Sequence, residues 1–535
     1  MILLALLGCN KSDDNNPDEP TLEVMTADGV WTPATAPTGS DDVLPIVPGI
    51  PNLDDDDSDG TVDWEQGLSD DNDLATFSVL PAHPTDLSFD NGGQAVRVWL
   101  SGNVVLNDEF TSMTMTKSKD PVELQVEFGD YLATAHLLLT DSVTGESVEV
   151  LLQGAPLILN NHLQPSELVA VMKVSSSWGD NDSMIADYKA VLPDGVFVGI
   201  AQNDYQQDVW VQDEIEFGTL TADGQRVDLV IDSIRNGLGR AGDGLDDLPE
   251  DEFEGPDFIR GEWGSGRATS QDSFGNLEIT PPVEGYPYGR IYYGTNGGRL
   301  SMADELVEFL ESQKVQDPFV LDSTWLCVGH VDEYQTFVPD SSSEKGFKLV
   351  WSDTNVAWEI LEGMDPETEL PRYRSGHGFA TVGEILEDDE LVKYNEEVQE
   401  DYLDPQLEGF KAELGLTDDD VILIPALFEE LGWCSNTGLA LIPGMANLIV
   451  ADDANGQTTL FVPDPYVRSD EDDLGSDPVA QAFVDSMPSD LRIEFIDDWD
   501  IYHLGMGEVH CGTNVIRTPA DSATWWLDAR HLISE

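Results

Sequence analysis

The sequence has 535 residues, of which 105 are Asp or Glu and 24 are Lys or Arg, so the formal net charge is −81. Because contacts to phosphate need clustered cations, this balance argues against a nucleic-acid partner and disfavours electrostatic docking on anionic lipid. Hydrophobic residues still make up 40% of the chain, enough for a large folded core, so the acidity indicates either solvation in a salty medium or binding of calcium or a cationic substrate.

The chain opens with a short apolar run over residues 2–7 that ends in small residues. Such a run is too short to span a bilayer and is typical of an export signal, so we expect residues 1–8 to be a signal peptide. The segment LLGC (6–9) resembles the lipobox of bacterial lipoproteins, although no basic residues precede it. That resemblance implies cleavage before Cys9, lipid on its thiol, and an exported lipoprotein held to the membrane by this anchor alone, in the periplasm or at the cell surface. A buried strand or a frayed apolar end is the alternative.

Residues 9–50 are rich in Pro, Asp, Asn, Thr and Gly without a sustained period, which predicts an acidic flexible tether. The acidic run that follows places carboxylates at alternate positions before a glycine, like the first half of an EF-hand calcium loop. The twelfth position of this loop carries Gln66 in place of the usual Glu. A solvated acidic run is the alternative. The expected calcium ligands here are Asp55, Asp57, Asp59 and Asp63.

Residues 75–155 are rich in predicted strands. The segment Val122–Phe128 alternates strictly between apolar and polar residues, as a half-buried strand does, and 94–100 and 146–152 are further candidates. Turn signals separate these segments. Several short strands in succession predict a small β-sandwich, which we assign to residues 51–155.

From residue 156 onward, predicted strands alternate with helical segments, which indicates an α/β domain over 156–535. Residues 301–304 resemble a capping box and precede an apolar pattern with helical spacing. A second helical region covers about 388–414 and is interrupted at Pro405.

The cysteine count allows few disulfides. With Cys9 lipidated, three cysteines remain (Cys327, Cys434 and Cys511), so at least one is free or pairs between chains. The sequence leaves open whether Cys327 and Cys434 pair. A lone thiol in an exported protein is a candidate nucleophile.

Four segments mix acids, His, Cys, Gly and Trp where core strands would be apolar: residues 209–218, 272–282, 327–333 and 507–515. Read singly, each has an ordinary interpretation, such as a satisfied polar pair or a buried structural thiol. Together they hold a Cys, a His and two Asp, which suits nucleophilic attack on the cationic planar carbon of a guanidinium. The carboxylates bind its N–H groups, the thiolate attacks, and the imidazole gives a proton to the departing ammonia.

In these four segments, and in their order, the chain resembles the protein-arginine deiminases. The resemblance covers essentially 156–535 and extends to GPDF, YPYGRIYYG, IPALFEELG, GMANLIV and TWW. It implies an α/β fold of the pentein type, a five-bladed α/β propeller, preceded by a small immunoglobulin-like β-sandwich over 51–155. The predicted tether stands where the family has an N-terminal cupredoxin-like domain.

The resemblance also implies roles for single residues. Cys511 would be the nucleophile, and His330 would act first as the general acid and then as the base that activates water. Asp213 and Asp332 would bind the guanidinium. The intermediate would be a thiouronium adduct on Cys511, which water hydrolyses to citrulline.

Substrate contacts outside the reacting group are implied in the same way. Trp210 and Val328 would line the slot for the aliphatic arginine stem, and Arg235 would contact the substrate backbone. Two further arginines of the family are replaced by Gly237 and Gly505. Recognition of a peptide backbone is therefore expected to be weaker or different.

Calcium is the cofactor that the resemblance implies, and oxygen-only ligand sets suit this hard cation. The residues themselves agree, because three neighbouring carboxylates at positions 213, 214 and 216 raise one another's pKa unless a cation lies among them. One site would use the side chains of Gln212, Glu216 and Glu278 with the carbonyl oxygens of Phe274 and Leu277. A second would use Glu214, Asp232, Ser233 and Asn236.

The sequence therefore predicts a calcium-dependent hydrolase that converts protein-bound arginine to citrulline and ammonia, with arginine-containing proteins as partners. One alternative keeps the chemistry but takes free arginine or another small guanidine as substrate. Another is a non-enzymatic calcium-binding surface lipoprotein. The oligomeric state stays open.

Overall fold

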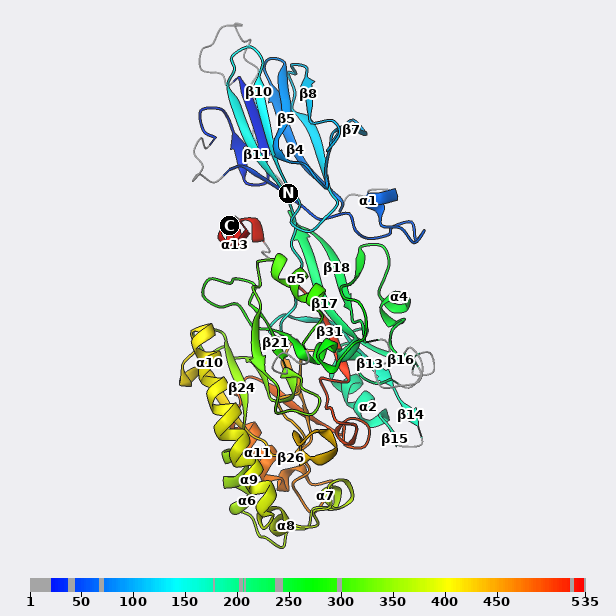
Figure 1. The fold of residues 1–535 in the computed structure, drawn as a ribbon, viewed down its shortest axis with the longest axis vertical. Helices are drawn as coiled ribbons and strands as arrows, with labels where there is room; N and C mark the ends of the chain where they lie inside the picture. Colours follow the sequence, from blue (N-terminus) through cyan, green and yellow to red (C-terminus); the bar gives the residue numbers. More distant parts are fainter. Residues whose placement is uncertain are drawn as a thin grey trace. The chain divides into compact units, whose positions relative to one another are not determined.

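The computed structural model describes residues 21–36, 44–66, 72–176, 179–201, 205, 208–235, 244–295, 301–519 and 524–533 (Figure 1). The described residues divide into two compact units. The smaller comprises the chain up to Leu53, Thr61–Ala155 and Thr221–Gln225, and the larger comprises Asp54–Gly60, Pro156–Leu220 and Arg226 onward. The predicted signal segment, Cys9 and Asn236 lie outside the described residues.

The described strands of the smaller unit form two sheets whose apolar side chains share one core. Neighbouring strands pair antiparallel, except that β3 pairs parallel with β11. This arrangement is a β-sandwich, and its classification as immunoglobulin-like stays a prediction. In spatial order the first sheet contains β2 (Gly29–Trp31), β1 (Leu22–Thr26), β4 (Leu74–Pro81), β9 (Val122–Phe128), β6 (Val96–Leu100) and β7 (Asn103–Leu106). The second contains β3 (Ile46–Gly49), β11 (Ser147–Gly154), β10 (Thr134–Asp141), β5 (Thr85–Gly92) and β8 (Ser112–Met115).

The strands predicted from alternation are present, but the tether predicted over 9–50 is wrong for its described part. β1, β2 and β3 lie within that range and belong to the two sheets. Leu22 and Val24 are fully buried, and Val47 is 2% exposed. These strands are too short to show a sustained period among Pro, Asp and Gly, although their few apolar residues complete the sandwich core.

In the larger unit, the described strands include five sheets of three or four strands. In four of them the central strand pairs antiparallel with one neighbour and parallel with the other. These are β16 (Phe197–Ala201), β13 (Ser166–Lys173) and β31 (Thr513–Arg517); β20 (Leu277–Ile279), β21 (Ile291–Thr295) and β22 (Phe319–Asp322); β23 (Gln335–Pro339), β24 (Phe347–Asp353) and β25 (Val421–Pro425); and β28 (Ile449–Asp452), β29 (Thr458–Pro463) and β30 (Arg492–Ile496). The fifth contains β12 (Ile158–Leu159), β17 (Ile215–Ala222), β18 (Gln225–Asp232) and β19 (Phe258–Glu262), with β18 and β19 parallel.

The remaining strands form two short hairpins among the described residues, and helices connect the sheets. The hairpins are β14 (Ser175–Ser176) with β15 (Gly179–Asp180), and β26 (Phe428–Leu431) with β27 (Thr437–Ala440). The helices are α1 (Asp63–Gln66), α2 (Asp182–Val191), α3 (Val211–Glu214), α4 (Leu248–Glu252), α5 (Asp304–Ser312), α6 (Thr354–Glu362), α7 (Pro371–Gly376), α8 (Val382–Leu386), α9 (Asp389–Val398), α10 (Asp404–Leu414), α11 (Pro478–Ser486), α12 (Trp525–Asp528) and α13 (Arg530–Ile533).

Both predicted helical regions exist, with local differences. α5 begins after Ala303, which provides no side-chain cap, so the predicted capping box is wrong; the backbone N–H of Ala303 instead donates to Asp272 Oδ1 at 2.7 Å. The interruption between α9 and α10 is a π-helical turn over Gln399–Leu403. Pro405 lies in the first turn of α10, directly after this π-helical turn.

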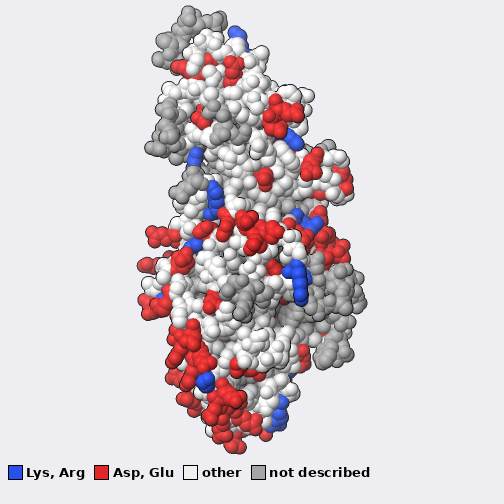
Figure 2. Space-filling model, in the orientation of Figure 1, with Lys and Arg blue, Asp and Glu red and all other residues white. Residues whose placement is uncertain are grey.

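Acidic side chains form separate patches on the surface (Figure 2). On the face shown in Figure 2 they gather over the helical part of the larger unit, where the exposed acids of α9 and the following turn include Asp389, Glu390, Glu396, Glu397 and Asp401. None of the helices in the described part of the chain combines the length and apolar character needed to cross a membrane.

Candidate active site

Residues from five separate parts of the sequence line one pocket of about 280 Å³ in the larger unit. Asp213 belongs to α3. His330 directly precedes a 3₁₀ turn, and Cys511 lies two residues before the start of β31. The backbone N–H of Gln212 donates to the carbonyl oxygen of Cys511 at 3.2 Å, which ties α3 to the cysteine turn. The lining residues are Trp210, Asp213, Arg235, Ser270, Ser273, Val328, His330, Gly505, Met506, Gly507 and Cys511.

Trp210 is held against the cysteine turn by a close approach at Gly507. A Cβ atom on this glycine would lie 2.5 Å from the indole of Trp210 and 3.1 Å from Cβ of Cys511. A larger residue would push the ring away from the wall of the pocket. Trp210 and Val328, both predicted to contact the arginine stem, are partly buried and line the pocket.

Cys511 is the described cysteine without a disulfide, and it is 5% exposed. Asn447 holds it at two points, donating from Nδ2 to Sγ at 3.2 Å and accepting the Cys511 backbone N–H at 3.1 Å. The thiol Sγ lies 3.4 Å from Asp332 Oδ2. Burial raises the pKa of the thiol well above its usual value, and the negative charges of Asp332 and Asp213 raise it further.

The His330 imidazole lies between Asp213 and the Ser270 backbone. Its Nδ1 is 3.5 Å from Asp213 Oδ1, and its Nε2 is 2.8 Å from the Ser270 carbonyl oxygen. Because a carbonyl can only accept, Nε2 carries a proton there. Glu333 Oε1 accepts the backbone N–H groups of Gly329 and His330, at 2.9 and 2.7 Å, and so fixes the turn that carries the imidazole.

Asp213 and Asp332 each present a buried oxygen without a protein partner. Among the described atoms, Oδ1 of both carboxylates has no hydrogen bond. The second oxygen of Asp332 is 2.9 Å from His510 Nδ1. Burial raises the pKa of Asp213, while His330 and Arg235 oppose that shift. Two orphaned carboxylate oxygens near a thiol and an imidazole suit a ligand with several N–H donors and a positive charge.

Arg235 lines the pocket, but its guanidinium already pairs with protein carboxylates. Nη1 lies 3.1 Å from Glu214 Oε2 and 3.3 Å from Asp208 Oδ2, and Nη2 lies 3.8 Å from Asp213 Oδ2. The side chain is only 4% exposed. Its predicted contact with a substrate backbone stays a prediction.

The first predicted calcium set lies together in one place. Gln212, Glu216 and Glu278 line a common cavity, and the Phe274 and Leu277 carbonyls belong to the turn that leads into β20. Gln212 Nε2 donates to Glu216 Oε2 at 2.9 Å and to the Phe274 carbonyl at 3.1 Å. The amide nitrogen thus lies between two predicted oxygen ligands, and the same amide rotated by half a turn offers an oxygen.

Two buried carboxylates share this cavity with one buried guanidinium, that of Arg517. Burial raises the pKa of Glu216 to about 8. It also raises the pKa of Glu278 well above the usual value, with further contributions from Asp332 and Glu216. Within the described residues, Glu278 Oε1 has no hydrogen-bond partner. These oxygen donors fit a hard divalent cation.

The second predicted calcium set is only partly described. Glu214 Oε1 and Asp232 Oδ1 are buried and have no hydrogen bond to any described group. Burial raises the pKa of Asp232 to about 8, with Glu250 adding to the effect. Ser233 Oγ donates to the Asp272 carbonyl at 2.7 Å, so its hydroxyl already has a partner.

The acidic loop brings three of its four predicted ligands together. Single carboxylate oxygens of Asp55, Asp57 and Asp59 lie within 4.8 Å of one another, whereas Asp63 begins α1 and lies outside this group. Asp55 also accepts the backbone N–H groups of Asp59 and Gly60, at 3.0 and 2.7 Å. These local bonds shape the loop without any ion.

Sequence reasoning missed several groups that touch the reacting side chains. Asn447 contacts the thiol, Ser270 and Glu333 hold the imidazole, and His510 contacts Asp332. Glu333 and His510 lie inside the segments that stood out, next to residues that were assigned roles. Nothing in the sequence marks Ser270, because its contact runs through a backbone carbonyl.

The larger unit is thus an α/β domain in which a buried thiol, an imidazole and the Asp213 carboxylate line one pocket, with Asp332 against the thiol. The family model of protein-arginine deiminase (PAD) matches residues 146–527. Human protein-arginine deiminase type-1 is 34% identical over 396 residues, which cover 70% of this chain and 56% of the relative. Human protein-arginine deiminase type-4 is 32% identical over 421 residues, covering 74% of this chain and 58% of the relative. The chain belongs to the protein-arginine deiminase family, and it spans just over half the length of these relatives.

Among solved structures, a C. jejuni agmatine deiminase aligns with 68% of this chain and 97% of its own. The TM-score is 0.38 and the sequence identity is 13%, values too low to support any inference from this similarity.

Proposed function

We propose that the protein hydrolyses the guanidinium group of arginine to a ureido group, giving citrulline and ammonia. The observation that supports this most directly is that Cys511, His330 and Asp213 line one pocket and that Asp332 lies 3.4 Å from the thiol, with one oxygen of each carboxylate free of hydrogen bonds to described groups. Membership of the protein-arginine deiminase family supports the same chemistry.

The proposed reaction proceeds in two displacement steps. Asp213 and Asp332 bind the guanidinium N–H groups and place its central carbon beside Sγ of Cys511. The thiolate forms a C–S bond, a C–N bond breaks, and His330 gives a proton to the departing ammonia. His330 then takes a proton from water, whose oxygen attacks the thiouronium carbon; the C–S bond breaks and the thiolate is restored.

Substrate binding itself favours the reactive thiolate in this proposal. In the empty pocket, the two carboxylates raise the thiol pKa. A bound guanidinium compensates both charges, so the thiol loses its proton more readily when substrate is present than when it is absent.

We further propose that arginine within proteins is the substrate. The two human relatives are named protein-arginine deiminases, which supports this choice. Free arginine or a small guanidine is the second candidate, favoured by Gly505 at the pocket, where the resemblance implies an arginine in the family. Turnover of an N-acylated arginine amide compared with free arginine distinguishes the two. Preference for free arginine would overturn the protein-substrate proposal alone.

Calcium dependence is part of the proposal. Gln212, Glu216 and Glu278 would hold one calcium ion, whose positive charge would neutralise the carboxylates around α3. Citrulline should form from an arginine-containing peptide in the presence of calcium and not with chelator. Absence of citrulline at every calcium concentration would overturn the enzymatic proposal, whereas equal activity under chelator would overturn the calcium dependence only.

The fold and location assigned from the sequence remain proposals as well. The repeated pairing of one antiparallel and one parallel neighbour in four described sheets supports a pentein propeller, in which each sheet is a blade. The disulfide between Cys327 and Cys434 supports an oxidising compartment and hence export. If Cys9 carries the lipid, Cys9→Ser should move the protein from the membrane fraction to the soluble fraction.

A further inference from the structure

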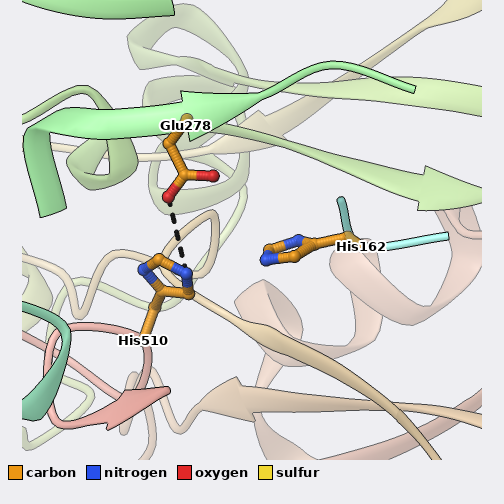
Figure 3. Close-up of side chains that lie close together, drawn as sticks. All are labelled: His162, Glu278 and His510. Atoms are coloured by element: carbon orange, nitrogen blue, oxygen red, sulfur yellow. Dashed lines mark ion pairs between the residues drawn. The ribbon is translucent and has the colours of Figure 1, made fainter. Parts of the chain in front are cut away.

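A second, smaller cavity, the one that the first predicted calcium set lines, lies at the other edge of the His510 imidazole. Nδ1 of this ring is 2.9 Å from Asp332 Oδ2, whereas Nε2 is 3.5 Å from Glu278 Oε1 (Figure 3). The cavity has a volume of about 30 Å³, room for a single ion or water, and its charged and polar lining comprises Asn160, His162, Gln212, Glu216, Glu278, His510, Asn514 and the buried Arg517. His162 enters it from the segment that follows β12.

The three side chains in Figure 3 converge on one point. One nitrogen from each of His162 and His510 and one oxygen from Glu278 all lie within 4.8 Å of one another. Ligands on a tetrahedron with zinc-type bond lengths are about 3.4 Å apart, and the 3.5 Å between His510 Nε2 and Glu278 Oε1 fits that spacing.

The outer nitrogens of both rings are held in the way that histidine metal ligands usually are. His162 Nδ1 lies 3.0 Å from Thr336 Oγ1, and His510 Nδ1 lies 2.9 Å from Asp332 Oδ2. A partner on Nδ1 fixes the ring orientation and leaves Nε2 for a metal. The ring centroids are 5.4 Å apart at an angle of 66°, so the two imidazoles do not stack.

Polar atoms around the cavity lack partners within the described structure. Glu278 Oε1 and both side-chain polar atoms of Asn160 are buried without a hydrogen bond. Glu278 is 9% exposed and Asn160 is 7% exposed. Orphaned buried groups of this kind are costly unless water or an ion satisfies them.

We propose that His162, Glu278 and His510 form a binding site for a nitrogen-preferring divalent cation of the Zn²⁺ type, with Asn160 or water as the fourth ligand. Two imidazoles and a carboxylate are a zinc-type set, whereas calcium prefers oxygen ligands only. Neither histidine belongs to the calcium set expected from the family resemblance, but Glu278 does. The two cations therefore compete for this carboxylate, and Zn²⁺ on Nε2 of His510 would fix the Nδ1 proton toward Asp332.

The test is zinc binding to the full chain, which does not depend on the proposed reaction. Calcium-free protein is titrated with zinc chloride by calorimetry, in the wild type and in His162→Gln, His136→Gln and Cys511→Ser. His136 is a matched control because it pairs with Glu149 at 2.7 Å on the β-sandwich. We expect His162→Gln to weaken zinc binding by at least about tenfold. His136→Gln and Cys511→Ser should bind zinc as the wild type does, and calcium affinity should stay unchanged in His162→Gln.

Two results would overturn the proposal. One is equal zinc affinity in the wild type and in His162→Gln. The other is loss of zinc binding in Cys511→Ser while His162→Gln still binds zinc, which would place the ion on the catalytic thiol. Cobalt(II) offers a check that needs no variant. In the wild type, Co²⁺ should give the intense visible absorption of a four-coordinate site, and added Zn²⁺ should remove it. A spectrum of six-coordinate Co²⁺ alone would contradict the site.

Discussion

The Sγ atom of Cys511 lies 3.4 Å from Oδ2 of Asp332, so the buried thiol has a carboxylate as its direct neighbour. The same carboxylate oxygen is 2.9 Å from His510 Nδ1. Asp332 thus connects the thiol to the second cavity, and in the absence of a cationic ligand its charge keeps the thiol protonated.

Replacing Asp332 with Asn is expected to make Cys511 more reactive toward an uncharged reagent while abolishing deimination. The carboxylate raises the thiol pKa, so removing its charge lowers that pKa and increases the thiolate fraction at a given pH. A shift of one unit gives about tenfold faster alkylation by iodoacetamide at pH values below the thiol pKa. The rate of Cys511 modification, followed by mass spectrometry, measures this.

Asp340→Asn is the matched control, because Asp340 bonds to Ser342 and does not contact the thiol. Slower or unchanged alkylation in Asp332→Asn would show that the carboxylate does not suppress thiol ionisation.

Asp213→Asn is expected to lower kcat/KM for an arginine peptide by about a hundredfold. Removing one partner of a buried charge pair costs about 2–5 kcal/mol, and the guanidinium would lose one of two carboxylates. Steady-state citrulline formation at saturating calcium measures the effect. Asp228→Asn, which removes the partner of Arg226 on β18, serves as the control. A loss in Asp213→Asn no larger than in this control would exclude Asp213 from guanidinium binding.

Local patterns in the sequence were sufficient where one face of a strand is buried over several residues. Val122–Phe128 alternates in the sequence and forms β9. β1 and β3 were not predicted, because two or three apolar residues within a Pro- and Asp-rich stretch are too few to show a sustained alternation. Pairing with β4 and β11 makes them strands. The π-helical turn before α10 was likewise not predicted; Gln399 at its start is buried and donates to Asp353.

The site shows the same limit. The roles of the catalytic side chains were predicted from a family resemblance, because spacing along the chain does not show which segments meet in the fold. His162 lies in a segment with no other chemical signal, and its closeness to Glu278 and His510 follows only from the fold. The number of cysteines left open whether Cys327 pairs with Cys434. The fold brings their Cα atoms to 5.8 Å, and the two form a disulfide.

Glu216→Gln is expected to raise the calcium concentration for half-maximal activity by at least about tenfold, the effect of losing a group that supports a metal. Glu216 accepts from Gln212 at 2.9 Å and would supply a negatively charged oxygen to the first calcium set. Citrulline formation across a calcium series measures the shift. Glu305→Gln, a carboxylate that bonds to Ser265 at the surface, should leave the series unchanged. If both variants need the same calcium as the wild type, the ligand role of Glu216 is wrong.

Removing the disulfide by a Cys327→Ala, Cys434→Ala double substitution is expected to lower the free energy of unfolding by about 2–5 kcal/mol. The bond closes a loop with a sequence separation of 107, so its loss increases the conformational freedom of the unfolded chain. Urea unfolding followed by tryptophan fluorescence measures the change, and Trp325 and Trp433 report locally because they flank the two cysteines. Cys511→Ala breaks no crosslink and controls for the loss of a thiol.

Because Cys327 precedes Val328 in the pocket wall, the double variant should also lose substrate affinity. An unchanged urea midpoint would mean that the surrounding sheets already fix this loop without the bond.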